Sequence, residues 1–448
     1  MNLPLKFQSR MQEMLKTEYD AFVSAFTEGN PAEGIRLNTL KSVQKPGFLT
    51  DPVPWCSDGY YISKKDMSGN HPYHLGGLLY FQEPSAMSVT NVLQIQPGDF
   101  VLDLCAAPGG KATHAGANLR GEGLLIANEI VPSRAKILAE NIERMGIKNA
   151  IVLNENPEKL EKHFTDFFDK IIVDAPCSGE GMFRKEPQAI TEWSEEHTFS
   201  CASRQKNIVE SALKMLKKGG MLVYSTCTFA PCENEGVCQY ILENHPDMEL
   251  VPINLPMLSN GDGEYIGSDM DFSGTKRIFP HKNRGEGHFL ALFRRKGDGE
   301  RISLKSAKPV EGITDAVKQY QLFEKETLNT TLSGEFLLFG ENLYLSPLNL
   351  DLGGLKVVRP GLHLGMCKKG RFEPAHALVL ALNCESFKET VTFSSDSEEI
   401  KKYLHGETLP GDGKGWTAVL CDGLPLGWAK ASNGVLKNHY PKGLRTNK

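Results

Sequence analysis

Residues 103–111 read Asp-Leu-Cys-Ala-Ala-Pro-Gly-Gly-Lys and follow the short apolar run 100–102. An apolar run, a turn of small residues and a helical segment, here 112–119, are typical of a strand, loop and helix in an α/β fold. The small side chains let the backbone approach a ligand, and open α/β sheets bind ligands at the carboxyl ends of their strands. The stretch therefore predicts a doubly wound sheet whose first loop is a binding site.

Further along the chain the same alternation of strand and helix continues. One helical segment, 132–145, starts with a proline and stops at Gly146, and a second, 202–217, carries an apolar stripe and is followed by Gly219. Because strands alternate with helices, we expect a mostly parallel sheet. Its other strands are predicted at 123–128, 150–153, 170–173 and 221–225.

The regions that flank this sheet differ from it in pattern. With 448 residues, of which 40% are hydrophobic and 23% charged, the chain predicts two or three domains of ordinary composition. We expect an N-terminal helical arm at 1–75, the sheet domain at 76–296 and a charged, Gly-rich linker at 297–312. Alternating apolar residues at 335–345 and 355–359 predict a small, separate α+β domain at 313–448.

Composition excludes several classes of protein. The sequence contains no run of about 18 uncharged apolar residues, which a membrane span would need, so we expect a cytoplasmic protein. The 10 cysteines are irregularly spaced and predict free thiols. A net charge of -5 argues against a protein that coats nucleic acid, but the tail has a local basic path. Its members are Lys430, Lys437, Lys442, Arg445 and Lys448.

Two acidic residues at strand ends indicate a nucleoside cofactor. Glu129 follows the second strand about 20 residues after the first loop, the interval at which an acid binds ribose hydroxyls. Asp174 ends the fourth strand at the same edge. NAD stays possible on this pattern, whereas Lys111 lacks the spacing of a P-loop.

Two cysteines leave neighbouring strand ends. Cys177 lies in Asp-Ala-Pro-Cys-Ser-Gly after the fourth strand, and Cys227 lies in Ser-Thr-Cys-Thr after the fifth. In a doubly wound sheet both ends lie beside the first strand, so the thiols are expected to share a site facing the first loop. Buried cysteines that only fill space are the alternative. A zinc site at Cys227, Cys232 and Cys238 is a weaker one, because no C-x-x-C spacing or His pair accompanies them.

At these residues the chain resembles the NOL/NOP/Sun family of RNA cytosine-C5 methyltransferases. The resemblance covers residues 36 to about 294 and includes Arg36-Leu37-Asn38, Glu233-Asn234-Glu235 and the segments 82–87 and 277–281. It implies a Rossmann-like, class I S-adenosylmethionine-dependent core. The residues that it assigns to the methyl donor are Cys105, Ala106, Ala107, Pro108, Gly109, Gly110, Lys111, Glu129 and Asp174, with Asn156 where the family usually has an Asp.

The resemblance also assigns chemical roles to the side chains of the site. It implies that Cys227 adds to carbon 6 of the cytosine and that Cys177 assists product release. Asp174, protonated or hydrogen-bonding, is expected to help at the ring nitrogen. In the competing DNA cytosine-C5 enzymes the two thiols would exchange roles.

The tail resembles the bacterial branch of this family that acts on small-subunit ribosomal RNA, the RsmF type, which ends in a PUA-like RNA-binding module. We expect Lys430, Lys437, Lys442 and Arg445 to bind phosphates and the aromatic rings of Trp428 and Tyr440 to stack on bases, although two core aromatics are the alternative. The implied substrate of a monomeric enzyme is a cytosine near the decoding site of 16S rRNA. Alternatives are another rRNA site, tRNA, or a ribosome-assembly protein without activity.

Overall fold

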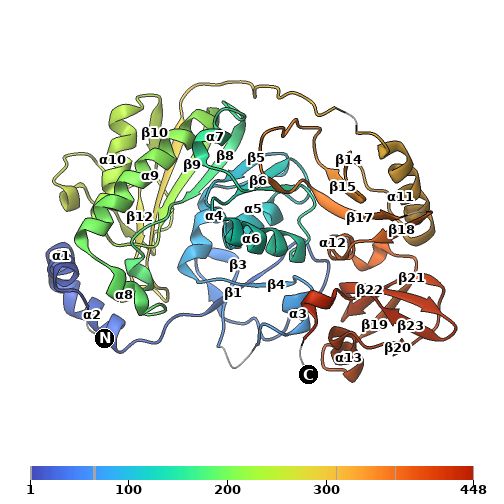
Figure 1. Cartoon of the computed structure of the whole chain (residues 1–448). Helices are drawn as coiled ribbons and strands as arrows, with labels where there is room; N and C mark the ends of the chain where they lie inside the picture. Colours follow the sequence, from blue (N-terminus) through green and yellow to red (C-terminus); the bar gives the residue numbers. More distant parts are fainter. Residues whose placement is uncertain (1–2, 64–66, 309, 369, 447–448) are drawn as a thin grey trace.

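A computed structural model describes residues 3–63, 67–308, 310–368 and 370–446. Within these ranges the central sheet is 10-stranded, in the order β11-β12-β13-β9-β8-β5-β6-β7-β16, with β10 paired to β13 outside that path. Figure 1 shows this sheet between the N-terminal helices on one side and the C-terminal strands on the other.

Parallel strands form the middle of the sheet: β5 (Phe100–Asp103), β6 (Leu124–Asn128), β7 (Ala150–Leu153), β8 (Phe168–Asp174) and β9 (Leu216–Thr226). They are the strands that the apolar runs predict. β8 pairs with both β5 and β9, and Asp174 is in register with Ser225. The α/β fold is confirmed, and the ends of β8 and β9 lie side by side.

Helices connect these strands and bury an apolar core on each face of the sheet. They are α5 (Gly110–Asn118), α6 (Pro132–Arg144), α7 (Pro157–Leu160) and α9 (Glu195–Met215). α9 begins at Glu195 instead of residue 202, because the Ser194 hydroxyl accepts a 3.1 Å hydrogen bond from the His197 N–H and caps the helix there. Among the described residues, no helix is both long and apolar enough to cross a membrane.

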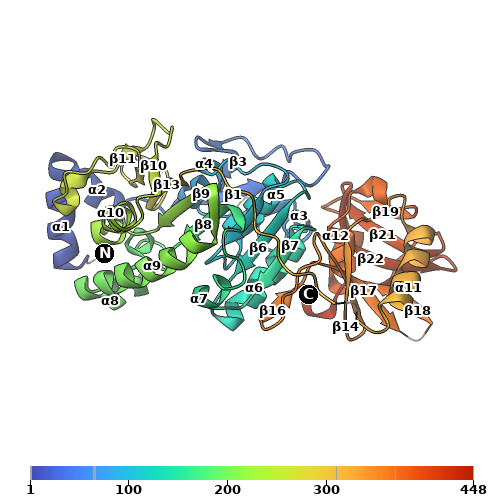
Figure 2. The same cartoon turned by 90° about the horizontal axis from the view of Figure 1, so that it is seen from above.

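One edge of the sheet is antiparallel. β13 (His288–Arg295) pairs with β9, and β12 (Lys276–Ile278), β11 (Ser259–Asn260) and β10 (Met248–Val251) extend from it. α10 (Glu235–Asn244) contacts β10 at this edge, whereas the short α8 (Gln188–Glu192) lies beside α9 in Figure 2. The sheet is therefore mixed rather than wholly parallel.

The N-terminal arm contains a small sheet as well as helices. The amphipathic segment forms α1 (Leu5–Leu15) and α2 (Tyr19–Thr27), with a break at Lys16, whose φ is 52°. β1 (Gly34–Leu37), β2 (Pro52–Val53), β3 (Cys56–Tyr61) and β4 (Leu79–Phe81) form a separate antiparallel sheet. The short α3 (Pro72–Leu75) lies between β3 and β4, and α4 (Ser88–Val92) leads from the small sheet to β5.

The C-terminal region has two sheets that share one apolar core. The first contains β14 (Glu335–Phe339), β15 (Asn342–Ser346), β17 (Leu362–Lys368) and β18 (Arg371–Pro374), with α11 (Ile313–Thr327) beside it. The second, with α13 (Glu398–His405), is the PUA-like part, and α12 (His376–Leu380) contacts both sheets. Its strands are β19 (Thr390–Phe393), β20 (Leu409–Pro410), β21 (Gly415–Cys421), β22 (Leu424–Ser432) and β23 (Val435–Asn438).

Two details of the C-terminal region differ from the sequence prediction. The segment 335–345 is a hairpin that turns at Gly340, with φ 60°, and not one strand. β16 (Val357–Arg359) leaves the C-terminal region and pairs with β7 at the edge of the central sheet. This backbone pairing joins the C-terminal region to the central sheet, which the sequence did not predict.

The linker also contacts the central domain. The Arg301 guanidinium lies 3.3 Å from the ring centroid of Phe100 and 2.5 Å from the carboxylate of Asp169. In Figure 1 the linker arches from β13 over the molecule to α11. Residues 297–308 thus follow the surface of the central domain.

Candidate active site

The loop 105–111 lies at the carboxyl end of β5, as predicted, and small residues allow its course. Gly109 has a φ of 119°, and a Cβ there would lie 3.3 Å from side-chain atoms of both Leu138 and Asn141. The Asn141 amide also donates a 2.8 Å hydrogen bond to the carbonyl oxygen of Pro108. Side chains of α6 therefore hold the loop 105–111 in place.

Glu129 follows β6 and is buried, with 3% of its surface exposed. Its carboxylate accepts a 2.9 Å hydrogen bond from the Val131 N–H and lies 3.2 Å from the Arg134 guanidinium. Arg134 also donates to the Ala107 carbonyl at 2.8 Å. One arginine thus connects the predicted ribose-binding acid to the loop.

Asp103 is a site residue that the motif contained but to which the sequence assigned no role. Its side chain is fully buried at the end of β5, and neither oxygen accepts a well-formed hydrogen bond from the described residues. Burial raises the pKa of Asp103 to about 8, against the opposing charge of Lys111. A buried acid without a partner beside a binding loop indicates a ligand with a hydrogen-bond donor or a positive charge.

Asn156 lies three residues beyond β7, is exposed and starts α7 without capping it through its side chain. The buried polar residues at this strand end are Asn154 and Glu155. The Asn154 amide donates to the Glu129 carbonyl at 2.7 Å, and the Glu155 N–H donates to the Asn128 side chain at 3.0 Å. These two residues hold the β6 and β7 ends together.

Asp174, at the end of β8, is part of an ion pair. The Lys111 ammonium lies 2.7 Å from its carboxylate, and the Ser225 hydroxyl donates to it at 2.7 Å. Burial favours the neutral acid, but the charge of Lys111 and the nearby His288 outweigh it and lower the pKa of Asp174. Of the two forms that the sequence left open for Asp174, the structure favours the ionised one.

The two cysteines meet. Cys177 Sγ and Cys227 Sγ are 3.2 Å apart, within hydrogen-bond distance for sulfur. The hydrogen bond with Cys227, together with burial, raises the pKa of Cys177 well above its ordinary value. Cys177 is therefore a neutral thiol near neutral pH, and its S–H can donate to the neighbouring sulfur.

A buried glutamate that the sequence left without a role connects the two cysteine loops. Glu233 accepts hydrogen bonds from the Ser178 N–H at 3.0 Å, from the Ser178 hydroxyl and from the Gln205 amide at 2.8 Å. The Ser178 hydroxyl in turn lies 2.8 Å from that of Thr228. Because Ser178 follows Cys177 and Thr228 follows Cys227, Glu233 fixes both thiols.

The zinc alternative finds no support in the geometry of the described residues. Among the described residues, the sulfur atoms of Cys227, Cys232 and Cys238 do not form a cluster that could hold a metal ion. Cys238 is fully buried in the core, and Cys232 donates to the Thr198 hydroxyl. The Cys56 thiol donates to Asp58 at 3.0 Å in the interior.

The C-terminal residues separate into two groups. Trp428 and Tyr440 are each 2% exposed and belong to apolar cores, so the expectation that they stack on bases is wrong. Trp428 donates its N–H to the Ala375 carbonyl, which fixes the ring inside. Of the basic side chains, Lys430, Lys437 and Lys442 are exposed and Arg445 is partly exposed, whereas Lys448 lies outside the described residues.

Comparison with known proteins assigns the chain to a family. Models match it at residues 3–84 (N-terminal domain of 16S rRNA methyltransferase RsmF), 90–294 (16S rRNA methyltransferase RsmB/F), 322–382 (first C-terminal domain of RsmF) and 390–446 (RsmF PUA domain). The ribosomal RNA small subunit methyltransferase F of Shewanella baltica strain OS155 is 32% identical, covering 92% of this chain and 90% of the relative. The chain belongs to the RsmF family of 16S rRNA methyltransferases.

Further similarities agree with membership of the RsmF family. The Vibrio vulnificus methyltransferase F is 31% identical over 99% of this chain and 97% of its own. A methyltransferase homologue from Pyrococcus horikoshii has 28% identity and a TM-score of 0.57, covering 64% of this chain and 94% of that structure. NSun6 from the same organism, solved with SFG, matches in fold with a TM-score of 0.56 at 22% identity, covering 66% of this chain and 99% of its own.

Proposed function

We propose that this RsmF-family chain methylates carbon 5 of a cytosine in 16S rRNA, with S-adenosylmethionine as the methyl donor and Cys227 as the nucleophile. The observation that carries the proposal is the pair of thiols 3.2 Å apart beside the Lys111–Asp174 ion pair. Carbon 5 of cytosine is a weak nucleophile, and a thiolate that adds to carbon 6 turns it into an enamine carbon that accepts a methyl group.

The residues present fit the methyl donor, which when bound supplies an electrophilic methyl group. The small residues of 105–111 allow close approach of the backbone, and Glu129 lies where ribose hydroxyls are bound. The unpartnered Asp103 carboxyl suits the ammonium of the donor's amino-acid part. Asn156 would contact the adenine. Titration calorimetry tests this assignment: binding of NAD without binding of S-adenosylmethionine would contradict it.

The hydrogen bond between the thiols supports different roles for them. A neutral Cys177 can donate its S–H to the sulfur of Cys227. Once Cys227 is bonded to carbon 6 it is a thioether, and the largest cause of the raised Cys177 pKa is removed. Cys177 can then lose its proton to water and take the proton of carbon 5, while the bond from sulfur to carbon 6 breaks and releases the methylated base.

Lys111 and Asp174 are proposed to bind the cytosine ring. Addition of a thiolate at carbon 6 places negative charge at ring nitrogen 3, and a charged Lys111 can donate a proton or a hydrogen bond there. The ionised Asp174 can accept a hydrogen bond from the exocyclic amine. In this proposal Lys111 thus supplies the proton, and Asp174 orients both Lys111 and the cytosine ring.

Trapping with RNA that contains 5-fluorocytosine tests the nucleophile. We expect a covalent protein–RNA adduct in the wild type and in the control Cys384→Ala, and none in Cys227→Ala. Cys177→Ala should accumulate adduct even with ordinary RNA, because release is blocked. An adduct that survives Cys227→Ala but disappears in Cys177→Ala would reverse the roles, as in the DNA enzymes.

The substrate is proposed to lie near the decoding site of 16S rRNA, reached by a monomer in the cytoplasm. Lys430, Lys437, Lys442 and Arg445 would bind backbone phosphates. Bisulfite sequencing of ribosomal RNA with and without the gene identifies the modified base. Loss of a tRNA signal alone would favour a tRNA enzyme. Cofactor binding without methyl transfer to naked 16S RNA or small subunits would favour an assembly protein.

A further inference from the structure

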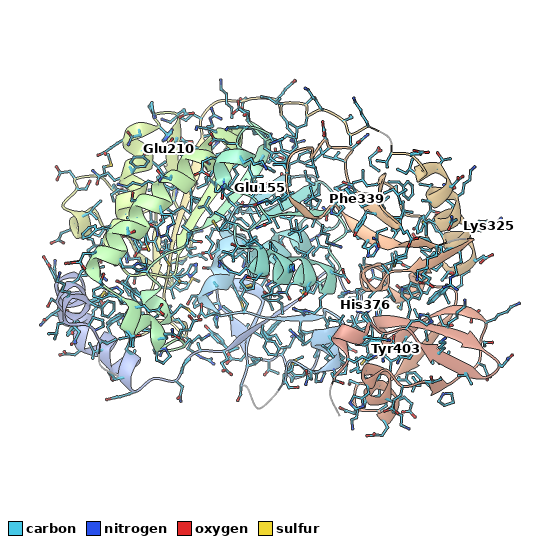
Figure 3. The ribbon with its side chains drawn as sticks, in the orientation of Figure 1. Glu155, Glu210, Lys325, Phe339, His376 and Tyr403 are labelled. Carbon is cyan, nitrogen blue, oxygen red and sulfur yellow. The ribbon has the colours of Figure 1, made fainter. Side chains whose placement is uncertain are left out.

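A cavity of about 360 Å³ lies where the central domain meets the C-terminal region. We call it the junction cavity; α6 forms one wall, β15, β16 and β17 a second, and α12 a third, with α6 in contact with both α12 and β16. Figure 3 labels His376, which lies at this junction. The volume is within the range of about 300–1,000 Å³ that small-molecule sites occupy.

Several hydrogen-bonding atoms in this cavity are buried without a partner. Arg359, on β16, is 4% exposed; its Nη1 donates to the Ile147 carbonyl at 3.2 Å, but Nε and Nη2 have no partner among the described residues. His363 Nε2 and His376 Nδ1 are also unpartnered there. Buried guanidinium groups normally have their hydrogen bonds satisfied, so three unsatisfied side chains around one cavity indicate a missing acceptor.

The geometry of the walls keeps these donors in place. The rings of His363 and Tyr344 stack with centroids 4.7 Å apart, and His376 meets Tyr440 edge to face at 5.2 Å. Aromatic neighbours therefore hold both histidine rings, unlike the side chains of an adventitious cluster of surface lysines.

Two arginines line the cavity, and two carboxyls oppose their charge. Arg144 and Arg359 line the cavity with Glu143 and Glu140, of which Glu140 is exposed. Burial raises the pKa of Glu143, and the carboxyl does not occupy Nε or Nη2 of Arg359. Burial also lowers the pKa values of His363 and His376 to about 4, so these rings are neutral when the cavity is empty.

We infer that the junction cavity binds a phosphate group, which Arg359 holds through Nε and Nη2 and the two histidines complete. A phosphate presents several acceptor oxygens in the geometry that a guanidinium fork matches. The phosphate is assigned to the backbone of the substrate RNA, because the cavity lies between α6, which fixes the loop 105–111, and the PUA-like part. This assignment to RNA rests on the proposed function, whereas phosphate binding itself does not.

Titration of the full-length protein with inorganic phosphate tests the site. We expect saturable binding by the wild type, at least tenfold weaker binding by Arg359→Gln, and unchanged binding by the control Arg371→Gln, which removes an exposed arginine of the same region. Glu143→Gln should bind phosphate more tightly, because it removes the opposing charge. No saturable binding by the wild type, or equal loss in both arginine variants, would overturn the inference.

Two further measurements keep the outcome clear. If circular dichroism shows that Arg359→Gln does not fold, phosphate binding by Glu143→Gln becomes the test. Phosphate binding by Glu143→Gln that is unchanged or weaker than in the wild type contradicts the inference. RNA binding is measured apart from methyl transfer, with a 16S fragment over a range of salt. If RNA is the source, Arg359→Gln lowers the slope of log K against log salt by about 0.7–0.9. Lost phosphate binding with unchanged RNA affinity would instead indicate a free phosphate compound and overturn the assignment to RNA.

Discussion

Glu233 shows how a residue without direct contact to the base can control the thiols. It has no exposed surface, and burial raises its pKa to about 7. Replacing it by Gln would place an amide N–H₂ against the Ser178 and Gln205 donors. We expect Glu233→Gln to lose about 1–3 kcal/mol in its free energy of unfolding, as for other unsatisfied buried groups.

The same variant separates support of the thiols from general stability. At a temperature where it is folded, kcat should fall while the affinity for S-adenosylmethionine stays, because the loop 105–111 does not contact Glu233. Glu243→Gln, an exposed glutamate on α10, is the control and should behave as wild type. A variant with normal kcat would show that Glu233 only stabilises the fold.

Asp103 makes a pH dependence testable. With a pKa raised by burial to about 8, its carboxyl holds a proton below that pH. Pairing with the donor's ammonium requires the carboxylate, so affinity should rise from about pH 6 towards pH 8, and fall up to about tenfold per unit below. Calorimetry across this range should show no such dependence in Asp103→Asn. The same slope in that variant would assign the proton to another group.

For single residues, the sequence predicted where a side chain lies along the fold better than it predicted what surrounds that side chain. The strand-order rule alone placed Cys177 and Cys227 together. It could not show that Asp103 is buried without a partner, since that depends on what packs around the end of β5. Trp428 and Tyr440 were misassigned for a similar reason: a lysine-rich segment looks accessible, but only the tertiary core shows that the aromatic side chains point inward.

At the scale of elements, α6 contacts two parts of the proposed cofactor site, the loop 105–111 and Glu129. Arg134 contacts Glu129 and the Ala107 carbonyl, and its own side chain is 52% exposed. We expect Arg134→Met to weaken binding of S-adenosylmethionine about tenfold, as for supporting contacts of bound groups, with little change in melting temperature. Lys136→Met, exposed on the same helix, should bind normally. Equal affinity in both variants would remove α6 from the site.

The elements that the sequence predicted well were those with a continuous pattern. The parallel strands are buried apolar runs with glycines or helices between them, and the structure matches them within a few residues. The break at Lys16 and the hairpin at Gly340 were missed, since in both places the apolar periodicity continues through a change of direction. β16 could not be predicted as part of the central sheet, because its partner lies about 200 residues away.

For the whole molecule, several contacts hold the C-terminal region to the catalytic part. β16 pairs with β7, the Lys41 ammonium donates to the Leu380 carbonyl, and the Tyr73 hydroxyl donates to Asp422 at 2.9 Å. These contacts do not require the linker. We therefore expect that cutting the full-length chain at a protease site inserted between Asp298 and Gly299 leaves both pieces together in size-exclusion chromatography, with a melting temperature near that of the uncut chain.

A chain that ends at residue 296 is the comparison. It lacks β16 and leaves β7 as an unpaired edge, which favours association between copies. We expect this shortened chain to aggregate at concentrations where the cut protein stays soluble. If the cut pieces separate on the column, the covalent linker and not the pairing holds the parts together.

The pairing of β16 with β7 also affects the order of events during protein synthesis. When the ribosome has made β7, its edge partner lies about 200 residues ahead, which at about 5–20 residues per second is a delay of roughly 10–40 seconds. During that time the nascent sheet has an open edge formed by Ala150–Leu153. Chaperone demand, and the effect of slow codons, should therefore be greatest for the stretch of message that encodes the linker and the first C-terminal strands.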